Sequence, residues 1–200
     1  MTKLMTFCAA AALTLPYFAN NDEGTTRYKV DADASEITWS ATKVTGEHMG
    51  TVGLLNGYMS VEDGELIAAN VIANMEAIAC TDLEGEWGDK LIGHLVSEDF
   101  FHVGEHKTSA FSLRELTATP DGDATHSVTG NFTIRGITQS VTFPANVTEK
   151  DGILSIQGEV VLDRSQFDVK YGSGSFFDNL GDNLIHDNFT VGFNLVAAAQ

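Results

Sequence analysis

The chain has 200 residues, 43% of them hydrophobic and 20% charged, and its formal net charge is −17. This length and composition suit one globular domain with a real core, and they exclude a disordered chain. The acidic charge excludes nucleic acid as a main partner and disfavours electrostatic docking on anionic lipid.

The N-terminal segment has the anatomy of a signal peptide. Lys3 supplies a positive start, and residues 4–12 form a mostly apolar run. We therefore expect a signal peptide over 1–19, a polar linker over 20–26 and one domain over 27–200. This organisation predicts a periplasmic or secreted protein.

Most of the domain alternates apolar and polar residues with period two, which is typical of strands with one buried face. The alternation is clearest in residues 36–42, 127–134, 141–147, 154–162 and 189–195. Turn sequences separate such runs, as hairpin loops should: Glu62-Asp63-Gly64, Pro120-Asp121-Gly122 and Lys150-Asp151-Gly152, with a tight bend at Arg135-Gly136. Because strands follow one another without intervening helices, we expect an antiparallel sheet.

Residues 82–96 carry a different pattern. Thr81 and Glu84 fit a capping box, with Thr81 as the N-cap. Apolar residues then recur every four positions: Leu83, Trp87, Leu91 and Leu95. The pattern predicts one amphipathic helix, inserted into an all-β chain, whose apolar stripe packs against the sheet.

A chain with about eight antiparallel strands is expected to close into a barrel or to form a sandwich, because closure removes exposed edges. An eight-stranded barrel is wide enough inside to hold one small ligand.

Five segments, in order along the chain, resemble the YceI-like family of secreted lipid-binding proteins. They are Tyr28–Trp39, the glycine-bearing Gly46–Gly57, Lys90–Phe101 with its His-Leu and Ser-x-Asp-Phe-Phe sequences, Gly130–Thr138, and Asp163–Phe167 with Arg-x-x-Phe. The resemblance implies an eight-stranded, lipocalin-like barrel over 27–200. It also implies that the barrel holds a polyisoprenoid or quinone-like lipid tail and catalyses no reaction.

The candidate ligand-binding residues are apolar and lie on strand faces that would point into a barrel, or beside its loops: Trp39, Phe101, Phe111, Phe132, Ile134, Val141, Phe143, Ile156, Phe177 and Phe193. Two Phe-Phe pairs, Phe100-Phe101 and Phe176-Phe177, are each expected to direct one ring into the mouth. From the residues alone, a packed core without a cavity remains the alternative for the inward-facing aromatic set.

Two other functions stay open at this stage. A filled barrel could serve as a module that binds a protein or a sugar. Less favoured is a metal enzyme that uses His94, His102 and His106, because their spacing fits no compact ligand motif. We expect no catalytic residue, cofactor or metal, and a homodimer stays open. Cys80 follows apolar residues, which favours a buried, unreactive thiol.

Overall fold

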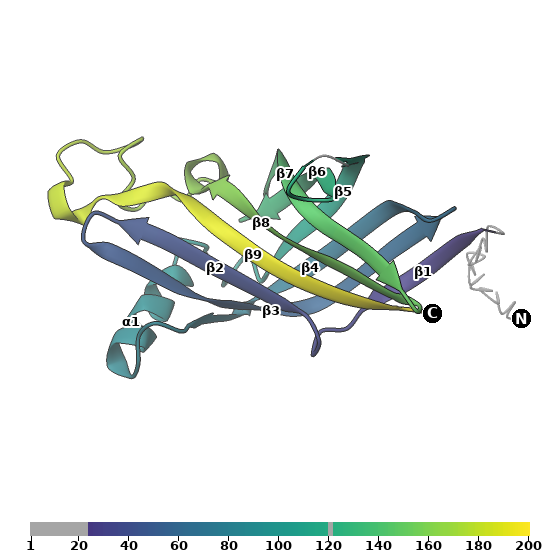
Figure 1. Cartoon of the computed structure of the whole chain (residues 1–200). Helices are drawn as coiled ribbons and strands as arrows, with labels where there is room; N and C mark the ends of the chain where they lie inside the picture. The colour runs from purple at the N-terminus through teal and green to yellow at the C-terminus, as the bar shows by residue number, and fades with distance from the viewer. Residues whose placement is uncertain (1–23, 120–121) are drawn as a thin grey trace, which may run out of the picture.

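The computed structural model describes residues 24–119 and 122–200 (Figure 1). The expected signal peptide and most of the linker lie outside the described residues, as do two residues of the turn predicted at Pro120-Asp121-Gly122. Thr25 and Thr26, expected in the linker, belong to the first strand.

Nine strands make up most of the described chain: β1 (Thr25–Val30), β2 (Glu36–Lys43), β3 (Gly46–Glu62), β4 (Glu65–Cys80), β5 (Thr108–Ala118), β6 (His126–Ile134), β7 (Ile137–Lys150), β8 (Ile153–Asp163) and β9 (Ile185–Ala199). One α-helix, α1 (Glu86–Leu95), lies between β4 and β5. Two short 3-10 helices, η1 (Arg164–Phe167) and η2 (Gly181–Asn183), lie between β8 and β9. In the described part of the chain, no helix is long and apolar enough to cross a membrane.

The strands close into an antiparallel barrel. From β2 to β9 each strand pairs with the next, and β9 returns to pair with both β2 and β1. β1 pairs with residues 58–62 of β3, and β2 pairs with residues 46–51 of the same strand. β1 and β2 therefore pair along different parts of the same neighbouring strand and together count as one strand of the barrel. The predicted eight-stranded antiparallel barrel is confirmed.

Three hairpins turn through two residues that both have positive φ. The φ angles are 50° and 82° at Asp63-Gly64, 54° and 74° at Arg135-Gly136, and 52° and 76° at Asp151-Gly152. Two consecutive positive φ angles characterise the hairpin turn whose twist matches that of the strands, and Gly adopts them without steric cost. The predicted turns thus set the register of β3–β4, β6–β7 and β7–β8.

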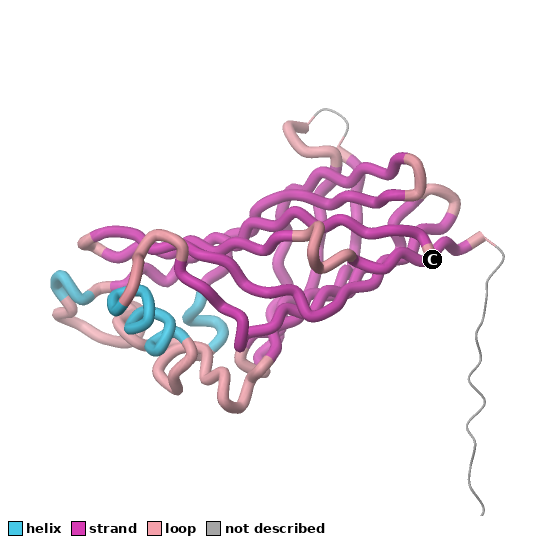
Figure 2. Tube along the Cα trace, turned by 90° about the horizontal axis from the view of Figure 1, so that it is seen from below, coloured by secondary structure: helices cyan, strands magenta, loops and turns pink. Residues whose placement is uncertain are grey.

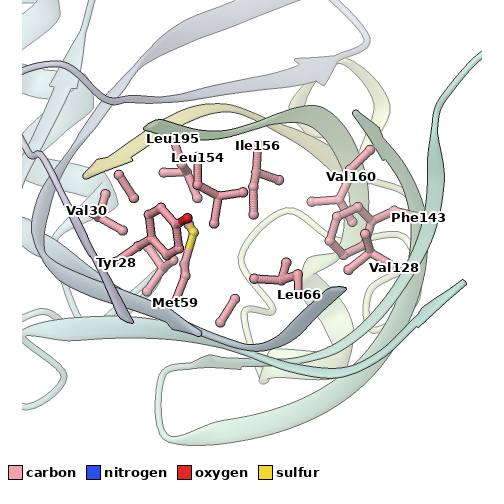
Figure 3. Packing of buried hydrophobic residues seen from close by; sticks show 14 of the residues in the cluster. Tyr28, Val30, Met59, Leu66, Val128, Phe143, Leu154, Ile156, Val160 and Leu195 are labelled. Carbon is pink, nitrogen blue, oxygen red and sulfur yellow. The ribbon is translucent and has the colours of Figure 1, made fainter. Parts of the chain in front are cut away.

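The main core fills the barrel at the end where β1 lies. Tyr28, Met59, Leu154 and Ala197 are each at most 2% exposed, and they come from four different strands. Figure 3 shows side chains of this cluster projecting from the barrel wall towards one another. The Tyr28 hydroxyl donates a hydrogen bond of 2.7 Å to Glu149 Oε1. This end of the barrel is therefore closed by packing.

The helical segments lie at the opposite end (Figures 1 and 2). A second core cluster forms there, in which Leu95 of α1 and Phe100 of the following loop are buried with Trp39 of β2, Ile78 of β4 and Val169 of the η1 loop. The helix thus covers one end of the barrel.

The helix differs from the prediction in its start and in the role of Trp87. It begins at Glu86, and its N-cap is Gly85, which offers no side-chain hydrogen bond. The Thr81 hydroxyl instead donates to the Met49 carbonyl of β3, at 3.3 Å, so it is unavailable as a cap. Trp87 is 70% exposed and lies under Lys90, whose Nζ is 4.9 Å from the ring centroid. The expected packing of Trp87 on the barrel is therefore wrong.

Candidate functional site

The barrel encloses a cavity of about 390 Å³ at the end that α1 covers. Its walls come from the barrel strands, and its rim comes from α1, the loop that carries Phe100 and Phe101, and the loop between β8 and β9. The volume falls within the range of about 300–1,000 Å³ that is usual for small-molecule pockets. This part of the barrel is therefore not filled by its own side chains.

A smaller compartment of about 90 Å³ lies further along the barrel and has only apolar residues in its wall. Both compartments share five wall residues: Ile37, Val71, Phe111, Phe132 and Val191. The Phe111 and Phe132 rings pack with their centroids 5.0 Å apart. These two rings thus stand where the large compartment meets the small one.

A glycine allows this aromatic pair to form. A Cβ atom at position 130 of β6 would come within 2.1 Å of the ring of Phe111 on β5, so only glycine at this position leaves room for that ring. Phe143 then packs against both Phe111 and Phe132, with centroids 5.9 and 5.8 Å away. Phe193 from β9 continues the cluster at 5.7 Å from Phe143.

Eight of the ten predicted site residues line this space. Trp39, Phe101 and Ile134 line the large compartment, Phe111 and Phe132 line both compartments, and Phe143, Ile156 and Phe193 line the small one. Val141 is half-buried against the main core and lines neither.

The two Phe-Phe pairs behave differently from one another. Both Phe100 and Phe101 line the large compartment, because they lie in a turn after α1 and not in a strand. Phe176 and Phe177 are 44% and 50% exposed, and neither ring lines either compartment. The expectation that Phe177 or its neighbour turns into the mouth is therefore not met.

Trp39 is fixed in the cavity wall by a hydrogen bond that crosses β3. Its indole Nε1 donates to the Ala79 carbonyl of β4, at 3.1 Å. The indole passes over Gly50, where a Cβ would lie 2.7 Å from Nε1 and 1.8 Å from the Ala79 oxygen. Gly50 is thus required for the position of the Trp39 ring.

The polar part of the cavity lining includes His94, Tyr171 and Arg164. The His94 ring packs edge-on against Tyr171 and Phe100, with centroids 4.3 and 5.0 Å away. His94 therefore lies in the cavity wall, whereas His102 and His106 form a separate group with Glu105. The three-histidine metal centre, a less favoured alternative from the sequence, is not formed by His94, His102 and His106.

Arg164 is buried, and its guanidinium is occupied by the chain itself. It donates to the carbonyls of His186, Val169, Tyr171 and Ile185 at 2.9–3.1 Å. Its Nη2 also lies 3.3 Å from Asp187 Oδ1. The guanidinium therefore ties β9 to the loop that begins with η1, and four of its five N–H groups are taken by backbone carbonyls.

The Arg164–Asp187 pair is held in its ionised form. Burial lowers the pKa of Arg164, and the charges of Asp187 and Asp163 oppose that shift. Burial raises the pKa of Asp187, but hydrogen bonds from Ser173 and Ser175 and the charge of Arg164 outweigh it, so the pKa is lowered. Arginine stays protonated at any ordinary pH, so the pair is ionic.

Sequence reasoning missed several lining residues of β3, β4, β9 and the loop before β9: Val52, Val71, Ala73, Met75, Ile78, Ile185 and Tyr171. Val71, Ala73 and Met75 are apolar residues at every second position of β4, as expected for residues on one face of a strand. Register shifts between β3 and β4 at Val52/Gly53, Leu54/Asn56 and Ser60/Val61 interrupt that period over the rest of the hairpin.

Comparison with known proteins gives a family and a fold. The sequence model of the YceI-like domain matches residues 28–197. No curated protein matches the chain. Among solved structures, BcnA of Burkholderia cenocepacia superposes with a TM-score of 0.66 at 20% identity, over 84% of this chain and 99% of BcnA.

Two further structures share the fold. A polyisoprenoid-binding domain from Saccharophagus degradans, implicated in plant cell wall breakdown, has a TM-score of 0.62 at 14% identity, over 86% of this chain and 98% of that domain. The YceI protein of Campylobacter jejuni has a TM-score of 0.50 at 18% identity, over 68% of this chain and 74% of its own.

Proposed function

Because the chain belongs to the YceI-like family, we propose that it binds a long isoprenoid lipid, with a polyprenyl or quinone-like tail, and carries or stores it outside the cytoplasm. The observation that carries this proposal is the apolar cavity, beyond which a second, wholly apolar compartment lies on the other side of Phe111 and Phe132. The polyisoprenoid-binding description of the Saccharophagus relative points to the same ligand class.

The energetics of an apolar wall favour a long tail. Burying one CH₂ group stabilises a complex by about 0.8 kcal/mol, so a five-carbon isoprene unit contributes roughly 4 kcal/mol at most. Association costs about 4–15 kcal/mol. Most of the cavity wall is apolar, and Arg164 is occupied by backbone carbonyls, so polar contacts add little to the affinity. Several isoprene units are therefore needed for useful binding.

The same features support binding without catalysis. Arg164, the buried charged residue of the cavity wall, is engaged in holding the loop between β8 and β9. His94 packs between two aromatic rings and is not paired with a carboxylate or a nucleophile among the described residues. We therefore propose a carrier or store, with the ligand's tail inside and its head group near α1.

The test is to narrow the cavity without adding polarity. Ala73 of β4 lines the large compartment. Ala73→Phe should lower the affinity for a fluorescent polyprenyl probe at least about tenfold, because the new ring occupies space that the tail needs. The thermal unfolding midpoint of the lipid-free protein should stay close to that of the parent.

The matched control is Ala118→Phe, since Ala118 is exposed near the end of β5. It should bind the probe like the parent. Unchanged binding by Ala73→Phe in a folded protein would show that the cavity is not the lipid site.

A further inference from the structure

We propose that His102, Glu105 and His106 form a binding site for a divalent transition metal, with Zn²⁺ as the best match. One ligand atom from each of the three side chains lies within 4.8 Å of the others. Around a tetrahedral zinc ion with bonds of about 2.0–2.2 Å, ligand atoms stand about 3.3–3.5 Å apart. Small side-chain rotations therefore suffice to bring all three onto one ion.

The backbone holds the three residues in this arrangement before any ion binds. They lie in a single turn, in which the amides of Glu105 and His106 both donate to the His102 carbonyl, at 3.0 and 2.9 Å. The turn is anchored by Val103, which is 5% exposed and whose amide donates to the Val96 carbonyl. His102 has a φ of 48°, a conformation that histidine adopts more readily than most residues.

The two imidazoles are also restricted. His102 is only 23% exposed, and its ring centroid lies 5.8 Å from that of His106. The His106 ring packs against the β6–β7 turn, where a Cβ at Gly136 would lie 3.2 Å from its Cε1. Histidines with limited rotamer freedom lose less entropy when they bind an ion.

The chemistry and the charge of the site suit a zinc-like ion. Two imidazoles and one carboxylate are ligands that zinc accepts, and three protein ligands leave a position for water. Glu98 Oε1 lies 3.8 Å from His102 Nε2, so a second carboxylate adds negative potential beside the site. The contacts of His102 with Glu98 and Glu105, at 3.8 and 3.9 Å, are too long for hydrogen bonds.

This site is distinct from the lipid cavity but adjacent to it. None of its three residues lines the cavity, whereas Phe101, which directly precedes His102, does. A bound ion would brace the loop that forms this part of the rim. The proposal does not depend on the lipid function.

The experiment uses the full chain, untagged and stripped with a chelator. Zn²⁺ is titrated in competition with a chromophoric chelator, and Co²⁺ is used for its visible absorption. We expect one equivalent to bind, with weakening of at least about tenfold in His106→Gln and in His102→Asn, the latter chosen because asparagine tolerates a positive φ. His126→Gln, at the opposite end of the barrel, is the control and should bind like the parent.

Circular dichroism confirms that each variant is folded, and either histidine variant alone is sufficient for the test. The proposal is overturned if the folded parent binds no zinc, or if both histidine variants bind it as tightly as the parent. A cobalt–thiolate charge-transfer band would also overturn it, since that band reports a cysteine ligand such as Cys80, whose thiol lies beside Asp82.

Discussion

Arg164 stabilises the loop between β8 and β9 from inside the protein. At 3% exposure it donates to four backbone carbonyls and pairs with Asp187. Arg164→Met keeps the volume of the side chain but leaves those carbonyls unpaired and Asp187 without its counter-charge. We expect a loss of about 3–5 kcal/mol in the free energy of unfolding, measured with urea.

Two further variants test whether the loss of stability is specific to the buried Arg164 and its pairing with Asp187. Arg114→Met, at an exposed position of β5, should change stability by no more than about 0.5 kcal/mol. Adding Asp187→Asn to Arg164→Met should recover part of the loss, because the uncompensated carboxylate is gone. Parent-like stability of Arg164→Met would contradict the structural role.

Asp82 joins the ends of β3 and β4 through its carboxylate. Burial raises the pKa of Asp82, but hydrogen bonds from the Met49 amide, His48 and Cys80 outweigh it and lower the pKa to about 2. The stabilisation is therefore fully present above the unfolded-state pKa of about 3.9, and it is lost as the pH falls towards 2.

Asp82→Asn should cost about 1 kcal/mol at pH 7, a modest value because solvent screens this partly exposed group. The gap between parent and variant should close between pH 4 and pH 2, which urea unfolding at several pH values will show. Asp123→Asn, at an exposed loop position, is the control. A gap that persists at low pH would mean that Asp82 acts through its shape and not its charge.

The helix α1 is held by its C-terminal end. Leu95 is 7% exposed in the second core cluster, whereas Trp87 is 70% exposed. We expect Leu95→Ala to destabilise the protein by about 2–5 kcal/mol and Trp87→Ala by less than about 0.5 kcal/mol. Thermal or urea unfolding of both variants measures this, and equal losses would contradict the observed packing.

Elements with local signals could be predicted from the sequence. The Asp-Gly and Arg-Gly turns fix the hairpins at 63–64, 135–136 and 151–152, and strict alternation marks β6 to β9. The start of α1 could not be predicted, because the Thr81 hydroxyl bonds to β3 and Gly85 takes the cap position. That choice depends on a contact between segments far apart in the chain.

At the scale of the whole barrel, the sequence indicated that the sheet closes into a barrel. It did not indicate how much of the interior is cavity and how much is packed core. Phe111, Phe143 and Ile156 face inward, as alternation predicts. The sequence pattern of inward-facing residues is the same for a packed interior and for a hollow one. The resemblance to YceI-like proteins favoured a hollow barrel. The expectation for Phe177 failed because Phe176 and Phe177 lie in a loop, where the alternation of strand faces does not apply.

The closure of the sheet brings the two ends of the described domain together. Tyr28 of β1 stands opposite Ala199 of β9, and the Gln200 amide donates to the Arg27 carbonyl at 2.9 Å. A short peptide could join residue 200 to residue 24, and the chain could be reopened in the Asp151-Gly152 turn, where Asp151 is exposed, without breaking a strand pair. The order of strands around the barrel is thus closed on itself. A circular permutant that begins at β8 retains every strand pairing of the native sheet.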